Sequence, residues 1–485
     1  MTIARYDQNF IGGRWVRSSG SELIDVVDAS TGRVIAKGPA GTEADVDAAV
    51  AEATAALPSW RALSPGERAV YLRAIADGLE ARREELARTI TSEVGCPIGL
   101  SRTLQCVTPV HSFRTAAAIA TSYPFERVLD NSHVVREPMG VVGAITAWNF
   151  PLHLVTVKSA FALAAGNTVV VKPSEVAPLT AVILGQIVAE AGLPAGVFNV
   201  VFGTGPEVGE AIVRHPDVAM VSFTGSTRAG RRIGELAADQ IKKVTLELGG
   251  KSPSLVLEDA DLEAAVVSTV DDCLINNGQR CDALTRLLVP RRRLAEAEQI
   301  AAERASKAVV GNPLDPATQV GPVVSAVQRD RIVALIRSGI DEGAKLVAGG
   351  PDAPELDADL ATGFFVTPTV FSEVTATMRI AQEEIFGPVL AIQPYDSADE
   401  AIELANDTVY GLHAAVWSAD ESDAMRVAGQ IQAGMVRIND GAFNPLAPFG
   451  GYKQSGLGRE FGEWGFEEFL EVKSMQTSAN SRPWM

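Results

Sequence analysis

Two patterns of hydrophobic and polar residues divide the chain. In the amino-terminal third, two helix starts carry capping residues in the expected order: Thr42 with Asp45, and Ser64 with Pro65 and Glu67. The apolar spacing after each cap predicts a helix. The second helix is expected to run, with an interruption, to about residue 92.

From residue 140 onward, short apolar runs alternate with helical patterns. Five runs predict buried strands: MGVVGAITAWN, NTVVVKP, GVFNVVFG, VAMVSFTGS and KKVTLELGG. β-Branched runs that alternate with helices predict a parallel sheet covered on both faces, whose ligands bind at the carboxyl ends of the strands. A second α/β stretch, from about Lys251 to Gly450, predicts a second domain. A chain of 485 residues agrees with about three domains.

Composition narrows the class of protein. Apolar residues make up 47% and charged residues 21%, which is typical of a globular protein and excludes disorder. The net charge of −18 argues against nucleic acid or an anionic membrane as the main partner. Four cysteines without CxxC spacing predict neither a disulfide framework nor a cysteine zinc site, and no metal is expected. The start lacks a secretory signal and the longest apolar region is interrupted by polar residues, so we expect a cytoplasmic protein without a membrane span.

Two familiar nucleotide-binding motifs fail on spacing. GTGPEVG has one residue too many for the GxGxxG fingerprint, and LGGKS lacks the first glycine of a phosphate-binding P-loop. The five histidines are scattered, so each is interpreted as structural.

Three stretches have the residue types of a catalytic site. Cys281 lies in the polar segment NNGQRCDALTR, where Arg280 would favour a thiolate, although a single cysteine is by default a small buried apolar residue. Glu247 lies in the apolar LELGG and is either a general base of raised pKa or an ion-paired strand-end carboxylate. Asn149 in TAWNFP offers an amide donor suited to an oxyanion hole, or belongs to an ordinary turn.

Together and in this order, these stretches resemble the aldehyde dehydrogenase superfamily. TAWNFP, KPSE, FTGST, LELGGK, GQRC, EEIFGPV and PFGGYKQSG all stand where that family has its signatures, from Phe10 to about Val472. Cys281 follows Glu247 by 34 residues, as the cysteine follows the glutamate in the family. The resemblance implies an α/β fold in three parts: a Rossmann-variant cofactor domain, an α/β catalytic domain and a small oligomerisation sheet.

The resemblance also implies roles for individual residues in oxidising an aldehyde to the acid with NAD. Cys281 would attack the aldehyde to form a thiohemiacetal, Asn149 and the Cys281 N–H would form the oxyanion hole, and Glu247 would activate water to hydrolyse the thioester. Lys158 and Glu460 would support proton transfer. The positions implied to bind NAD are Ile145, Trp148, Lys172, Ser174, Glu175, Gly205, Phe223, Gly225, Ser226, Leu248, Glu384 and Phe386.

For several of these positions, the resemblance implies which group of NAD the residue would contact. Lys172 and Glu175 would hold the adenosine ribose, where the carboxylate would repel a 2′-phosphate and favour NAD over NADP. Gly225 and Ser226 would face the pyrophosphate. Glu384 and Phe386 would hold the nicotinamide ribose and ring.

The implied domain boundaries are 1–120 and 139–249 for NAD binding, 250–450 for catalysis, and 121–138 with 468–485 for oligomerisation. A homodimer or homotetramer would follow.

Substrate choice stays open between alternatives. Arg280 either recognises an anionic group on the substrate, or pairs with Asp282 or another acid and turns away. A mixed apolar tunnel of Phe150, His153, Val157, Phe443 and Phe449 favours medium aliphatic or aromatic aldehydes. The competing activities are an acylating dehydrogenase that uses coenzyme A, a thiol esterase, and a non-catalytic binding protein on the same fold.

Overall fold

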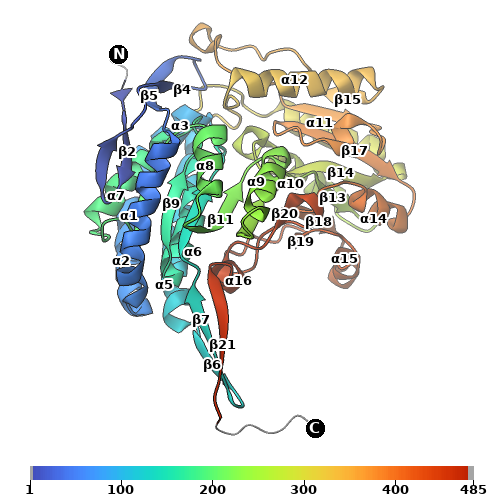
Figure 1. The fold of residues 1–485 in the computed structure, drawn as a ribbon. Helices are drawn as coiled ribbons and strands as arrows, with labels where there is room; N and C mark the ends of the chain where they lie inside the picture. Colours follow the sequence, from blue (N-terminus) through green and yellow to red (C-terminus); the bar gives the residue numbers. More distant parts are fainter. Residues whose placement is uncertain (1–3, 479–485) are drawn as a thin grey trace.

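The computed structural model describes residues 4–478. Figure 1 shows two large sheets with their helices, one on the amino-terminal side of the molecule and one formed mainly by the yellow and orange part of the chain. A narrow arm built from β6, β7 and β21 projects from the base. Three-stranded sheets form this arm and, near the amino terminus, the group β1 (Ala4–Arg5), β5 (Val34–Pro39) and β4 (Leu23–Val27).

The amino-terminal sheet has eight strands in the order β20-β12-β11-β8-β9-β10-β2-β3. Their bounds are β2 (Gln8–Ile11), β3 (Arg14–Arg17), β8 (Val141–Ile145), β9 (Thr168–Lys172), β10 (Phe198–Val200), β11 (Val218–Thr224), β12 (Lys243–Glu247) and β20 (Gly456–Leu457). The five central strands are the five predicted runs, and they are parallel as expected. The sheet as a whole is mixed, because β2, β3 and β20 add antiparallel edges that the repeating strand–helix pattern did not include.

Helices cover both faces of this sheet. One layer contains α2 (Pro65–Ala81), α3 (Arg83–Val94), α5 (Val107–Ser122), α6 (Pro151–Ala165) and α7 (Leu179–Glu190); the other contains α1 (Glu43–Ala62), α8 (Glu210–Arg214) and α9 (Thr227–Ala238). Both predicted capping boxes are present, at Thr42 before α1 and at Ser64 before α2. The interruption after α2 falls at Arg82. Within residues 4–478, no helix combines the length and apolar character needed to cross a membrane.

The second large sheet has seven strands in the order β15-β16-β17-β14-β13-β18-β19. Their bounds are β13 (Ser252–Val256), β14 (Leu284–Pro290), β15 (Lys345–Ala348), β16 (Thr369–Ser372), β17 (Val389–Tyr395), β18 (His413–Trp417) and β19 (Met435–Ile438). All pairs are parallel except that of β15. The helices of this part are α10 (Leu262–Leu274), α11 (Leu294–Ser306), α12 (Ala326–Asp341), α14 (Ala398–Asn406) and α15 (Glu421–Ala428).

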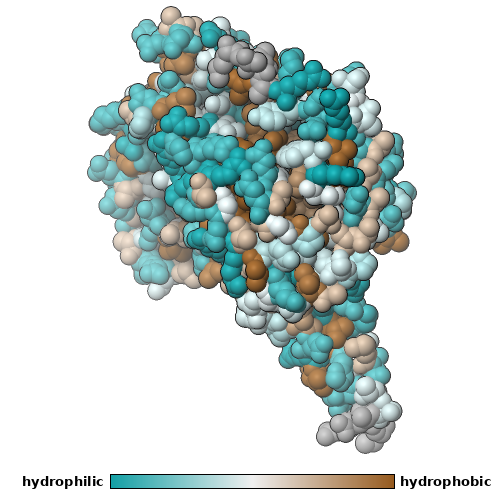
Figure 2. All heavy atoms as spheres, turned by 90° about the vertical axis from the view of Figure 1, so that its left-hand side faces the viewer, coloured by the Kyte–Doolittle hydropathy of each residue, from teal (hydrophilic) through white to brown (hydrophobic). Residues whose placement is uncertain are grey.

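The arm is an antiparallel sheet of β6 (Glu126–Leu129), β7 (Ser132–Pro138) and β21 (Leu470–Gln476). It carries apolar side chains that are about half exposed: Val128, Leu129, Val472 and Met475. Figure 2 shows the arm protruding from the body, with hydrophobic patches among hydrophilic ones. The last residues of the predicted oligomerisation segment, 479–485, lie outside the described part of the chain.

Candidate active site

The two large sheets are joined by the segment after β12, which runs beside the predicted nucleophile. A Cβ atom at Gly250 would lie 2.3 Å from the carbonyl oxygen of Cys281, and one at Gly249 would lie 2.5 Å from a carboxylate oxygen of Glu384. At position 250 only glycine allows this approach, because the neighbouring atom belongs to the backbone. The packing therefore brings the LELGG, GQRC and EEIFGPV stretches to one place.

Asn149 follows β8 and points at the turn that carries Cys281. Its Nδ2 donates to the carbonyl of Gln279 at 3.1 Å, and the Asn149 side chain is buried. Its backbone carbonyl accepts from the side chains of Gln105 and Asn276, both at 3.0 Å. An amide carries two N–H groups, so one donor of Asn149 remains available.

The turn before Cys281 is held by side chains that the sequence analysis did not single out. Asn276 and Asn277 have φ of +54° and +61°, and Gly278 continues the left-handed path at +74°. Asn277 donates to the carbonyls of Gly95 and Pro322 at 2.9 and 2.8 Å. The NNG sequence was the available signal, because asparagine and glycine are the residues that adopt this conformation most readily.

Arg280 favours a Cys281 thiolate as expected, since its charge lowers the pKa of that thiol, but this effect is outweighed. Burial raises the pKa of Cys281 well above its ordinary value, and the charges of Asp282, Glu247 and Glu384 raise it further, which outweighs Arg280. The resting group is a thiol at neutral pH. A base must therefore take its proton when the sulfur attacks.

Arg280 is fully engaged by two carboxylates. It forms a forked pair with Asp282, at 2.7 and 3.0 Å, and reaches Asp272 at 3.2 Å. Asp272 also accepts from Arg437 at 3.1 Å and from the Leu284 N–H at 2.9 Å. Of the two alternatives for Arg280, the structure shows pairing with Asp282. The cluster contains two guanidinium and two carboxylate groups and has no excess charge.

Glu247 ends β12 in a buried site, and neither of its carboxylate oxygens has a hydrogen-bond partner. Burial raises the pKa of Glu247 well above its usual range; the charge of Glu460 adds to this effect, while Lys158 opposes it. The alternative of an ion-paired strand-end carboxylate is therefore excluded. A carboxyl group with raised pKa and free oxygens is suited to act as a general base near neutral pH.

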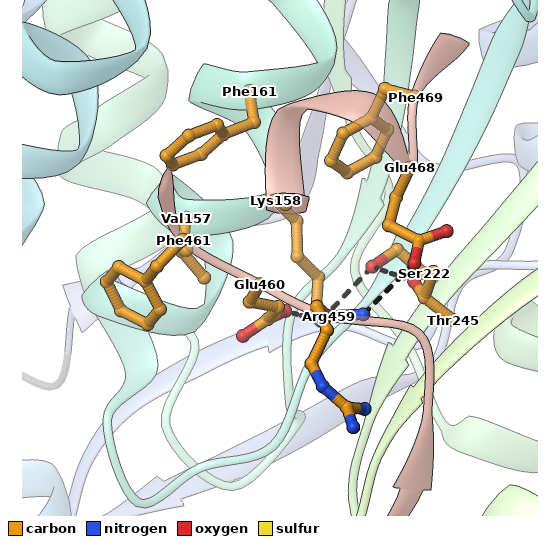
Figure 3. A pocket seen from close by; sticks show the side chains of 11 residues that line it. Val157, Lys158, Phe161, Ser222, Thr245, Arg459, Glu460, Phe461, Glu468 and Phe469 are labelled. Carbon is orange, nitrogen blue, oxygen red and sulfur yellow. Dashed lines mark hydrogen bonds and ion pairs between the residues drawn. The ribbon is translucent and has the colours of Figure 1, made fainter. Parts of the chain in front are cut away.

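Buried Lys158 and partly buried Glu460 form an ion pair of 2.5 Å beside this site. Figure 3 shows Lys158 extending from α6 toward Glu460, Ser222 and Thr245. Ser222 accepts from Lys158 at 3.2 Å and from Thr245 at 2.9 Å. These groups line a small pocket whose other wall residues include Arg459 and Glu468.

The predicted adenosine-ribose residues lie together at the end of β9. Lys172 and Glu175 form an ion pair of 2.6 Å, with Lys172 buried and Glu175 partly exposed. Burial lowers the pKa of Lys172, and the Glu175 carboxylate opposes this shift. Ser174 is buried and accepts from the Val176 N–H at 3.3 Å.

The predicted pyrophosphate residues form the start of α9. Ser226 caps this helix, and the Gly225 N–H donates to the Glu247 carbonyl at 3.0 Å. Three hydroxyl groups nearby are buried without hydrogen-bond partners: those of Thr146, Thr224 and Thr227. An open helix N-terminus with unused hydroxyl groups at the carboxyl ends of parallel strands fits a polar, anionic ligand such as a dinucleotide.

Glu384 and Phe386 lie next to the segment that joins the two sheets. Glu384 accepts from the Gly250 N–H at 3.0 Å, and burial raises the pKa of Glu384 to about 7. Phe386 has φ of +60°, which is strained for an aromatic residue, and meets Trp148 edge-on at 5.3 Å between ring centroids. Strain of this kind is typical of functional sites.

The other predicted cofactor residues are distributed along the same strand ends. Ile145 ends β8, Phe223 is buried near the end of β11, Leu248 follows β12 and packs on Gly230 of α9, and Gly205 begins a short π-helical turn after β10.

Comparisons with known proteins agree with the resemblance. The family described as the aldehyde dehydrogenase family matches residues 15–475. A 3-succinoylsemialdehyde-pyridine dehydrogenase of a Pseudomonas species is 46% identical over 471 residues, covering 97% of this chain and 98% of the relative.

Solved structures are equally similar. Aldehyde dehydrogenase C of Pseudomonas syringae, in complex with NAD⁺ and octanal, has a TM-score of 0.96 and 47% identity, covering 99% of this chain and 98% of that one. An aldehyde dehydrogenase of Mycobacterium tuberculosis, in complex with NAD⁺, has a TM-score of 0.96 and 44% identity, covering 99% of this chain and 100% of that one. The family and the fold expected from the sequence are confirmed.

Proposed function

The chain belongs to the aldehyde dehydrogenase family, and from this premise we propose that it oxidises an aldehyde to the carboxylic acid with NAD through covalent catalysis at Cys281. Two observations together carry the proposal: the Asn149 amide donates to the turn before Cys281, and the buried Glu247 carboxyl group has no hydrogen-bond partner. Solved relatives hold NAD⁺, which supports the same cofactor here.

The first step joins the Cys281 sulfur to the aldehyde carbon. The thiol proton passes to the Glu247 carboxylate, because the raised pKa of Cys281 keeps the resting group protonated. The substrate oxygen becomes negatively charged and is stabilised by the second Nδ2–H of Asn149 and by the Cys281 N–H. Fixed donors of this kind supply about 3–4 kcal/mol of transition-state stabilisation.

NAD, when bound, supplies the hydride acceptor that converts the thiohemiacetal into a thioester. Lys172 and Glu175 would hold the adenosine ribose, the start of α9 the pyrophosphate, and Glu384 the nicotinamide ribose. The carboxylate of Glu175 would repel a 2′-phosphate, which favours NAD over NADP.

The last step releases the acid. Glu247 first releases the thiol proton to solvent and then takes a proton from water, whose oxygen attacks the thioester carbon. The C–S bond breaks, and the Cys281 thiolate that leaves regains a proton from Glu247. Lys158 and Glu460 influence the protonation of Glu247 through their charges, since Glu460 raises its pKa and Lys158 lowers it.

NADH formation at 340 nm, measured with a panel of aldehydes and no coenzyme A, tests this activity. Turnover that is lost in Cys281→Ala supports the proposal. Product formation only with coenzyme A would indicate the acylating alternative, and NAD binding without any turnover would indicate a non-catalytic protein.

We also propose medium-length apolar or aromatic aldehydes as substrates. One relative is named for a pyridine-bearing semialdehyde and another was solved with octanal. The charge-neutral cluster around Arg280 supports uncharged over carboxylated substrates, because no guanidinium is left unpaired to bind an anion.

The domain roles and the assembly are part of the same proposal. Residues 1–120 with 139–249 would bind NAD, 250–450 would form the catalytic domain, and 121–138 with 468–485 would join subunits into a dimer or tetramer in the cytoplasm. The half-exposed apolar residues of the arm support this assembly. Light scattering on Val128→Lys and Val472→Lys tests it, and an unchanged mass would contradict it.

A further inference from the structure

His153 is the one residue of α6 that is not buried. All other residues of this helix, including Lys158, are enclosed. His153 lies in the first turn, four residues after Asn149. Asn149 donates to the carbonyl of Gln279, two residues before Cys281, so the first turn of α6 lies close to the nucleophile turn. The exposed part of α6 therefore faces the surroundings of the nucleophile.

Aromatic rings from separate parts of the chain surround His153. It stacks on Phe461 at 5.6 Å and 27°, and meets Phe150 edge-on at 6.4 Å. Phe461 in turn meets Phe443 at 5.4 Å and Phe449 at 6.0 Å. We call these five residues the aromatic cluster. Phe443 is 44% exposed, so the cluster reaches the surface.

The polar atoms of His153 are the unusual feature of this cluster. Its Nδ1 is buried and has no hydrogen-bond partner. Its Nε2 has no partner among the described residues either, but it is not sealed from solvent. Burial lowers the pKa of His153 to about 4, with a further contribution from Lys158, so the ring is neutral at pH 7.

A neutral imidazole carries one N–H. An unpaired buried N–H is rarer in proteins than an unpaired buried acceptor. The buried Nδ1 of His153 is therefore assigned as the unprotonated nitrogen, and the proton is on Nε2. The exposed edge of His153 then presents one hydrogen-bond donor within apolar walls.

We propose that His153 is a specificity-determining residue, which selects uncharged aromatic aldehydes that carry a hydrogen-bond acceptor such as an ether, carbonyl or ring nitrogen. The inference rests on the proposed function. A substrate with an acceptor pairs with the Nε2–H, whereas a purely apolar substrate strips water from that donor and leaves it unpaired. Sites that hydrogen-bond their substrate discriminate strongly against analogues that lack the group.

The test uses pairs of aldehydes that differ by one oxygen in place of a methylene. The pairs are 3-methoxybenzaldehyde with 3-ethylbenzaldehyde, and 4-methoxybenzaldehyde with 4-ethylbenzaldehyde. The second pair places the oxygen at a different distance from the aldehyde carbon. The measured quantity is the ratio of kcat/KM within each pair, with NAD at saturation.

His153→Phe retains a stacking ring but loses the donor. We expect its ratio, ether over alkyl, to fall about 5- to 30-fold relative to the unaltered enzyme in at least one pair. His153→Gln places an amide N–H near the Nε2 position and should retain the ratio within about threefold. Phe443→Leu is a matched change in the same cluster. It should lower kcat/KM for both members of a pair by the same factor and leave their ratio unchanged.

An unchanged ratio in His153→Phe, with the variant active on both compounds, would overturn the proposal. If the unaltered enzyme forms no NADH with any aldehyde, the proposed function fails instead. Calorimetric binding of the same pairs to Cys281→Ala, with and without His153→Phe, then still decides the role of His153, because the same loss of preference is expected in affinity.

Discussion

Replacing Glu247 by glutamine tests the part of the site that depends most on tertiary packing. The carboxyl group is buried, both its oxygens lack partners, and the charge of Glu460 acts on it. Glutamine has nearly the same shape but cannot accept the proton. The change therefore removes the base and leaves Cys281 and the cofactor residues in place.

The kinetic effect follows from the steps that need the base. A general base contributes about 10²–10⁴-fold, which corresponds to about 2.7–5.4 kcal/mol of activation free energy. We expect the rate of thioester hydrolysis in Glu247→Gln to fall by this factor. The rate of thioester formation should fall less, because the Cys281 thiol can pass its proton to solvent at high pH.

The effect on stability has a definite sign. The pKa of Glu247 is higher in the folded state than in the unfolded chain, so the unfolded chain releases the proton first as pH rises from about 4.5. Within the window up to the folded pKa, this group lowers the free energy of unfolding by up to about 1.4 kcal/mol per pH unit. Glu247→Gln should remove that slope.

Stopped-flow absorbance at 340 nm at pH 9 measures the kinetics, and urea unfolding between pH 5 and pH 8 measures the stability. The expected result for Glu247→Gln is a burst of NADH close to one per active site, followed by turnover reduced at least 100-fold. Glu235→Gln, an exposed carboxylate on α9, is the matched control and should resemble the unaltered enzyme.

Two results would refute this reasoning. Steady-state turnover of Glu247→Gln within a factor of five of the unaltered enzyme would show that another group activates water. An unfolding free energy with the same pH slope in both proteins would show that Glu247 is not the buried, unpaired carboxyl described above.

Three further changes probe the surroundings of the site. Glu175→Gln should lower the ratio of kcat/KM for NAD over NADP about 10-fold or more, since it removes the charge that repels a 2′-phosphate; an unchanged ratio would place the discrimination elsewhere. The KM for NAD should fall as pH rises through about 7, where Glu384 becomes ionised, and this dependence should be absent in Glu384→Gln. Arg280→Met should lower the midpoint of thermal unfolding, because it leaves the Asp282 carboxylate without its guanidinium partner and leaves Asp272 with only Arg437 and the Leu284 N–H; the cost of breaking such a pair is about 3–5 kcal/mol. Its relative activity on hexanal and on a carboxylated aldehyde should not change, and a selective loss with the latter would restore Arg280 as an anion-binding residue.

Much of the fold could be predicted because the signals are local. The β-branched runs became β8, β9, β10, β11 and β12, and the capping residues marked the starts of α1 and α2 where expected. The antiparallel edge strands were not predicted. β2 pairs with β10 and β20 pairs with β12, and pairing between strands so far apart in the chain leaves no local pattern. The β2–β3 hairpin around Gly12 and Gly13 did have a local signal, which the strand prediction did not use.

By itself, the sequence determined which chemistry this protein can carry out. A cysteine, a glutamate and an asparagine, each within a recognisable short motif, suffice to identify the family, since these motifs are local in the chain. Only the tertiary structure decided the electrostatic state of these groups. Arg280 sits beside Cys281 in sequence, yet Asp272 and Asp282 neutralise it, and burial keeps the thiol protonated. The pKa of a group depends on the charges and the solvent around it in space, and these come from elements far apart in the chain.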